Sequence, residues 1–208
     1  SYIQYGRISN AMSINIRIFS DYIWPFCYIG KGLVEKLSNE FDIRAEWISY
    51  EIHPETPPLG VPINRRFSII EIDRMIQNLR RMAAPLGITF AEISLLANSR
   101  LSLAVSEFAR DQGKFDQFHE QVFHAYFTLG LNIGELDIIQ SLAEKATLDT
   151  NALEQALREG RYLPRLQGAQ LEASRLGIKA APTFIVEDKE YIIGVQPIEV
   201  FQHVLKQY

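Results

Sequence analysis

Patterns typical of β-strands occur only near the two ends of this chain, and this distribution most limits the fold it can adopt. Apolar residues alternate with polar ones from Ile14 to Phe19, and a β-branched and aromatic run extends from Ile43 to Tyr50. Towards the other end, the apolar runs 181–186 and 191–194 flank a polar turn, which is typical of a β-hairpin. The long middle block contains no pattern that we interpret as a strand.

A helix is predicted between the first two strands. Pro25 is suited to the first position of a helix, where its missing N–H is not needed. Apolar residues then follow at spacings of three and four, which places them on one helical face: Phe26, Ile29, Leu33, Leu37 and Phe41. The resulting β-α-β unit crosses over right-handed in almost all proteins, so the two strands are expected to be parallel.

The middle block is predicted to be helical throughout. Ser68 and Glu71 form a capping-box pair ahead of its first helix. Further helical patterns span 101–108, 115–126, 136–146 and 153–157, and Gly113, Gly130 and Gly160 are expected to end three of them. The proline-rich stretch 52–64 before this block is predicted to be a loop. After it, one helix is expected over 163–176 and another from Pro197.

These patterns predict an α/β fold in which the two ends of the chain form one domain. We assign residues 12–64 and 165–208 to that domain and residues 65–164 to an all-helical insertion. Residues 1–11 are set aside, because Ser9-Asn10-Ala11 directly before Met12 is typical of an expression-tag remnant.

Composition limits the partners and the cellular compartment. The net charge is −4, and the basic residues form no long cluster, which argues against nucleic-acid binding. No apolar run approaches the roughly 18 residues that a membrane span needs. The single cysteine rules out an internal disulfide and fits a reducing compartment, so we expect a cytoplasmic protein. His119 and His124 are five residues apart, a spacing that does not suit a helical metal site, and we predict no metal.

The tetrapeptide Trp24-Pro25-Phe26-Cys27 lies where the first strand gives way to the first helix. It has the spacing of a redox Cys-x-x-Cys motif, but tryptophan occupies the position of the first cysteine. Trp24 cannot form a sulfur bond, and Cys27 is the only cysteine in the chain. Dithiol–disulfide cycling within one chain is therefore excluded.

Three segments carry a family resemblance, namely Ser20–Gly30, Tyr50–Pro54 and Gly177–Phe184. Together with the element order, they resemble the DsbA-like superfamily, a thioredoxin-like fold with a large helical insertion. More narrowly, they are similar to the FrnE-type branch, which is related to hydroxychromene-carboxylate isomerases and kappa-class glutathione transferases. In that pattern an exposed cysteine thiolate stands at the helix N-terminus, so Trp24 departs from the family at its reactive position.

The resemblance also implies a binding groove. Pro182 is expected to be cis and to face the Trp24-Pro25-Phe26-Cys27 motif, with the backbone of Ala181 free to pair with an extended ligand. The residues expected to contact this ligand are Tyr22, Pro25, Phe26, Ala181, Pro182 and Thr183. Trp24 marks the position of the missing nucleophile. Cys27 is either a single reactive thiol or a buried apolar residue, since free cysteines are among the most often buried side chains.

Three functional hypotheses remain open from the sequence. In the first, the chain is a relative of the DsbA oxidoreductases that holds a thiol, glutathione or a peptide, with at most single-thiol chemistry at Cys27. In the second, it is a glutathione-dependent isomerase or transferase that uses a hydroxyl from Ser20, Tyr22 or Tyr28. In the third, it binds a peptide or partner protein without bond chemistry. No tightly bound cofactor is expected, glutathione is the candidate ligand, and no oligomeric state is indicated.

Overall fold

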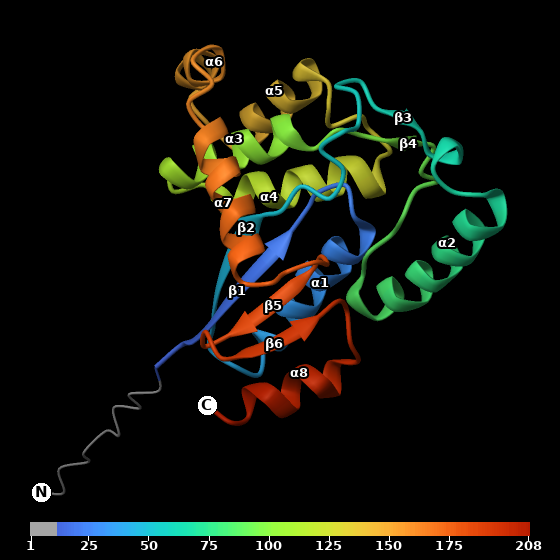
Figure 1. Cartoon of the computed structure of the whole chain (residues 1–208), viewed down its shortest axis with the longest axis vertical. Helices are drawn as coiled ribbons and strands as arrows, with labels where there is room; N and C mark the ends of the chain where they lie inside the picture. Colours follow the sequence, from blue (N-terminus) through green and yellow to red (C-terminus); the bar gives the residue numbers. More distant parts are fainter. Residues whose placement is uncertain (1–11) are drawn as a thin grey trace, which may run out of the picture.

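A four-stranded sheet forms the base of the structure, in the order β2-β1-β5-β6. The computed structural model describes residues 12–208, and the proposed tag remnant 1–11 lies outside the described residues. β1 (Ile14–Ser20) pairs with β2 (Ile43–Ser49) in parallel, as predicted. β5 (Thr183–Val186) and β6 (Glu190–Ile193) form the expected antiparallel hairpin, which joins β1 through β5. The two ends of the chain thus build one sheet (Figure 1).

Helices cover both faces of this sheet. On one face, α1 (Pro25–Leu37) and α8 (Ile198–Leu205) pack against a cluster of apolar side chains from all four strands. On the other face, α7 (Leu163–Arg175) packs against a smaller cluster around Phe19 and Ile185. Figure 1 shows α7 crossing the upper part of the sheet. The α/β thioredoxin-like architecture predicted from the sequence is confirmed.

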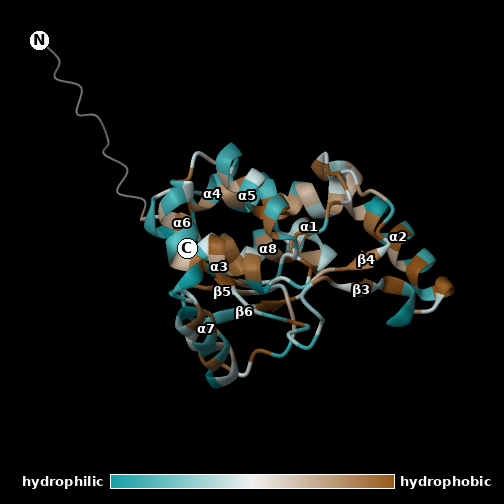
Figure 2. Ribbon diagram, turned by 90° about the horizontal axis from the view of Figure 1, so that it is seen from above, coloured by the Kyte–Doolittle hydropathy of each residue, from teal (hydrophilic) through white to brown (hydrophobic). Residues whose placement is uncertain are grey.

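The insertion holds the larger apolar core. Its helices are α2 (Ile69–Ala83), α3 (Arg100–Asp111), α4 (Phe115–Phe123), α5 (Leu136–Lys145) and α6 (Thr150–Arg158). A short π-helix, η3 (His124–Thr128), continues α4. Figure 2 shows α2 standing apart from the other insertion helices. The capping box at its start is present, since the Ser68 side chain accepts from the Glu71 N–H while the Glu71 side chain accepts from the Ser68 N–H.

The prediction of a strand-free middle block was wrong at one place. β3 (Val61–Pro62) lies in the stretch predicted as a loop and pairs antiparallel with β4 (Leu95–Leu96) inside the insertion. Strands of two residues have no periodicity, so sequence patterns cannot reveal them. Two short 3₁₀ turns, Ile63–Arg65 and Ala84–Leu86, flank α2. The domain boundary that we drew at 164/165 falls within the first turn of α7.

Within residues 12–208, no helix is long and apolar enough to cross a membrane. The described part of the chain therefore contains no candidate for a helical membrane span.

Gly60 and Gly87 provide a matched test of the β3–β4 connection. Both have positive φ, at 83° and 68°, but a Cβ at Gly60 would lie 2.7 Å from the Leu96 carbonyl oxygen, whereas a Cβ at Gly87 would meet nothing within 4 Å. We expect Gly87→Ala to lower the free energy of unfolding by about 1 kcal/mol. Gly60→Ala should cost about 2 kcal/mol more, because the backbone must also shift.

Chemical denaturation of the two variants checks this difference. If both variants lose the same unfolding free energy, the close approach of Gly60 to the Leu96 carbonyl oxygen does not affect stability.

Candidate functional site

The candidate site lies where the end of β1, the start of α1 and the start of β5 meet. Phe19 is opposite Thr183 in the sheet, so the residues that follow β1 lie beside Ala181 and Pro182. The Ala181–Pro182 peptide bond is cis. Gly30 lets α1 approach closely, because a Cβ there would lie 3.4 Å from Pro182 Cγ and 3.1 Å from Phe184 Cζ. The motif and the proline predicted to face it are therefore neighbours.

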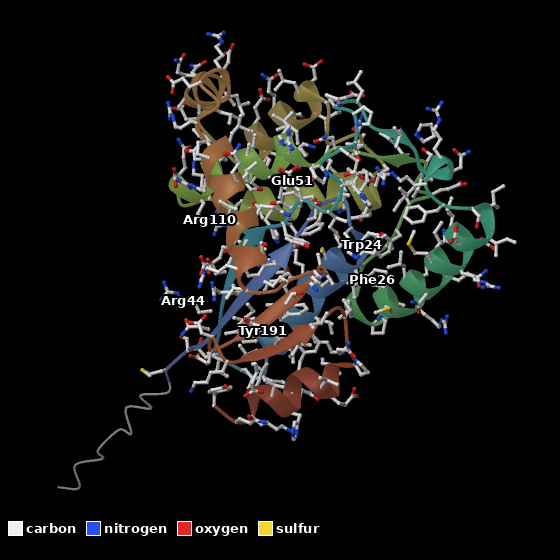
Figure 3. All side chains as sticks on the ribbon, in the orientation of Figure 1. Trp24, Phe26, Arg44, Glu51, Arg110 and Tyr191 are labelled. Atoms are coloured by element: carbon white, nitrogen blue, oxygen red, sulfur yellow. The ribbon has the colours of Figure 1, made fainter. Side chains whose placement is uncertain are left out.

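Two aromatic side chains mark the start of α1. Trp24 is the N-cap residue, and its indole makes no capping hydrogen bond to the described residues. This agrees with the chemistry of indole, which offers a donor and no acceptor. Trp24 and Phe26 are both partly exposed, and their ring centroids lie 5.8 Å apart. Figure 3 shows them at the start of α1, on the side that faces α2. They give the site an apolar surface.

Cys27 lies beneath this surface and is fully buried. Its Sγ accepts a hydrogen bond from the Asp21 N–H at 3.5 Å. Burial raises the pKa of the Cys27 thiol to about 12. The thiol is therefore protonated near neutral pH, whereas thiol–disulfide exchange requires the thiolate. Of the two interpretations left open by the sequence, this geometry supports the buried apolar residue.

Asp21 is a site residue that sequence reasoning missed. Its side chain is almost completely buried. One carboxylate oxygen accepts from the Ile52 N–H at 2.8 Å, and the other accepts from the Ile23 N–H at 3.4 Å. Burial raises the pKa of Asp21 to about 6, opposed by these two hydrogen bonds and by one from the Ser99 hydroxyl. The carboxyl joins the loop before α1, the segment after β2 and the insertion.

Tyr22 does not present its hydroxyl to the site. The hydroxyl is buried, and it contacts the Ser106 hydroxyl and, at 3.0 Å, His119 Nδ1. Burial lowers the pKa of His119 well below its usual value, so this histidine is neutral at physiological pH. Tyr22 therefore anchors the loop before α1 to helices α3 and α4, and it is not placed to contact a ligand as we had expected.

Ala181 offers the backbone groups expected of a ligand-binding edge. Within the described part of the chain, neither its N–H nor its carbonyl oxygen makes a hydrogen bond. Its neighbours are engaged, since the Thr183 hydroxyl donates to the Ala180 carbonyl at 2.6 Å and the Gly194 N–H donates to the Pro182 carbonyl at 2.8 Å. The segment is held from both sides while Ala181 itself remains free to pair.

The predicted site residues thus divide into two groups. Trp24 and Phe26 are partly exposed and contribute an indole and a phenyl ring. The others are buried and shape the site from below, namely Tyr22, Pro25, Cys27, Ala181, Pro182 and Thr183. Among residues 12–208, no three His, Cys, Asp or Glu side chains are grouped to hold a metal ion. The arrangement leaves the backbone of Ala181 unpaired and offers no free thiolate.

Comparisons with known proteins agree on the family. Residues 15–206 match the model of the DSBA-like thioredoxin domain. The uncharacterised protein YwbO of Bacillus subtilis is 32% identical over 194 residues, which cover 92% of this chain and 95% of YwbO. The 2-hydroxychromene-2-carboxylate isomerase of Sphingobium xenophagum is 24% identical over 180 residues, covering 86% of this chain and 91% of the isomerase.

A solved structure supports the same fold. The crystal structure of a probable DsbA oxidoreductase of Streptomyces coelicolor has a TM-score of 0.86 at 22% sequence identity. The match covers 93% of this chain and 89% of the other. The helical insertion and the sheet are therefore arranged as in that structure.

The burial of Cys27 predicts its reactivity. We expect the native protein not to react with DTNB at pH 8 on a timescale of minutes, because burial keeps the thiol protonated and covered. In denaturant the same thiol should react completely, which serves as the internal control. Fast labelling of the native protein, with an apparent pKa below the reference of about 8.5, would contradict the buried interpretation.

Asp21 predicts a pH-dependent stability. Its pKa rises from 3.8 to about 6 on folding, so its contribution to stability is full below pH 3.8 and is lost as the pH rises through 6. Relative to Asp21→Asn, the native protein should lose about 3 kcal/mol of unfolding free energy between about pH 4 and 7. Urea denaturation across this range measures the difference. The prediction is refuted if the unfolding free energy of Asp21→Asn depends on pH as strongly as that of the unaltered protein. It is also refuted if the control Asp137→Asn, at an exposed position, reduces the pH dependence as much as Asp21→Asn does.

Proposed function

The chain belongs to the family of DSBA-like thioredoxin domains, and we propose that it binds an extended thiol compound without performing dithiol exchange. The ligand class is glutathione or a cysteine-containing peptide, held between Trp24 and Pro182. The observation that carries this proposal is the unpaired backbone of Ala181 just before β5, together with a partly exposed Trp24 at the start of α1 and a cysteine with no solvent access.

The backbone of Ala181 supplies the polar part of recognition. One free N–H and one free carbonyl on the same residue can exchange two hydrogen bonds with a ligand residue in extended conformation. This is how an added strand pairs with a sheet edge. Such pairing selects for an extended peptide backbone and leaves the side chain of the paired ligand residue to be selected by its surroundings.

Trp24 and Phe26 supply the surroundings of that side chain. A cysteine side chain at the paired position would direct its sulfur towards the start of α1, where the indole replaces the family's nucleophile. Sulfur contacts with aromatic rings contribute about 0.3–1.5 kcal/mol. No covalent step follows, since Trp24 has no thiol and the Cys27 thiol is buried and protonated. Cys27 serves as a packing residue in this proposal.

A glutathione-dependent isomerase or transferase is the second candidate. Its support is the similarity to a protein named 2-hydroxychromene-2-carboxylate isomerase. The three hydroxyl-bearing residues that we considered for it, Ser20, Tyr22 and Tyr28, are all buried. The Tyr22 hydroxyl is also held inside the fold by Ser106 and His119, so the binding role has the stronger geometric support.

We further propose a cytoplasmic location. Proteins of oxidising compartments are often stabilised by disulfides. This chain has a single cysteine, which is buried and free, so its fold does not depend on such a compartment.

Isothermal titration calorimetry with reduced glutathione and S-methylglutathione tests the binding role. We expect both ligands to bind, because no sulfur bond is formed. Trp24→Ala should weaken binding at least tenfold. Cys27→Ala should leave it within about twofold, and so should the control Tyr191→Ala, whose exposed ring lies on β6 (Figure 3).

Three results would contradict the proposal. The first is no saturable binding of glutathione or of a cysteinyl peptide. The second is binding that requires Cys27, or a glutathione adduct on the native protein in a mass spectrum. The third is turnover of 2-hydroxychromene-2-carboxylate in the presence of glutathione, which would establish the second candidate instead.

A further inference from the structure

A cavity lies in the helical insertion, away from the Trp24–Pro182 site. It has a volume of about 550 Å³ and is bounded by α3, α5, α6 and the turn into α7 (Figure 1). None of the residues that line it belongs to the candidate site described above. Clefts of 300–1,000 Å³ are typical of sites for small organic ligands. We propose that this insertion cavity binds an aliphatic carboxylate, such as a medium-chain fatty acid.

The floor of the insertion cavity is aliphatic. Leu101 and Ala104 come from α3, Leu153 and Leu157 from α6, and only one aromatic residue, Tyr162, contributes to the lining. Two leucines on the walls remain strongly exposed, namely Leu136 at 48% and Leu163 at 43%. Removing the exposed part of each leucine from water favours binding of an apolar group. An alkyl chain lying in the cavity would cover both.

Exposed arginine–glutamate ion pairs form the rim of the cavity. Its charged lining residues are Arg100, Arg158, Arg161 and Glu154. The three arginine side chains are 48–69% exposed, and each pairs with a nearby glutamate. Exposed pairs of this kind are weak, so a guanidinium can exchange its partner for a ligand carboxylate. A bidentate arginine–carboxylate contact then fixes one end of the ligand.

The walls are held in place before any ligand enters. The Tyr162 hydroxyl donates to Asp111 at 2.8 Å, and Arg165 donates to both oxygens of the same carboxylate at 2.9 and 3.0 Å. These contacts fix the turn between α6 and α7 against α3. At the other end, a Cβ at Gly134 would lie 2.5 Å from the Pro58 carbonyl oxygen, so two loops meet without a side chain between them. A preformed cavity binds at a lower entropic cost.

Fluorescence titration with 11-(dansylamino)undecanoic acid tests the proposal, with its methyl ester as the uncharged comparison. We expect saturable binding of the acid, and weaker binding of the ester by at least fivefold. Leu163→Glu should weaken binding of the acid at least tenfold, because it places a carboxylate on an exposed wall. The combined variant Arg100→Gln/Arg161→Gln should weaken binding of the acid severalfold and leave the ester unchanged.

The control variants change residues of α7, the helix that also contains Leu163. Leu171→Glu changes a leucine of α7 that is 71% exposed and lies outside the cavity, and Arg175→Gln removes an exposed, ion-paired arginine of that helix. Both should bind the acid as the unaltered protein does, and so should Trp24→Ala. Circular dichroism establishes that each variant is folded.

The proposal is overturned if the acid does not bind saturably, if folded Leu163→Glu binds as well as Leu171→Glu, or if the ester binds as tightly as the acid. Loss of binding in Trp24→Ala would place the probe at the other site and overturn it equally.

Discussion

One buried carboxyl group joins the parts on which the candidate site depends. Asp21 accepts hydrogen bonds from backbone N–H groups on either side of the site, while its own N–H donates to Cys27. Burying an ionised carboxyl group is costly, and the raised pKa reports that cost. The start of α1, the segment after β2 and the insertion are held together around this group. An apolar or amide side chain could fill the space, but it would not offer two acceptor oxygens to the same donors.

Local patterns were enough to predict most elements of the fold. Alternation in Ile14–Phe19 and the helical spacing after Pro25 reflect burial on one face, and both can be read from the local sequence. The Ser68–Glu71 capping box is entirely local, and the structure contains it. The β3–β4 pair could not be predicted, because its stability comes from a partner more than thirty residues away. The two segments become neighbours only after the chain has folded.

The candidate site was harder to predict, because burial of its polar groups is decided by distant residues. Ser20-Asp21 has the composition of an exposed turn, and nothing local indicates that Ile52 and Ser99 will enclose Asp21. Tyr22 likewise turns away from the ligand surface, because its hydroxyl is hydrogen-bonded to the Ser106 hydroxyl and to His119 Nδ1. The insertion cavity left no signal at all, since its leucines share the helical spacing of ordinary core residues.

The burial of the one thiol has a consequence for how the protein responds to oxidants and for how its motions can be observed. A sulfur atom without solvent access is modified only when the surrounding structure opens. The rate at which Cys27 is modified therefore measures how often the structure opens locally at the start of α1. Every molecule therefore carries one internal reporter of local unfolding, placed at the junction between the sheet and the insertion. In the folded protein this thiol is covered and does not meet redox-active molecules in solution.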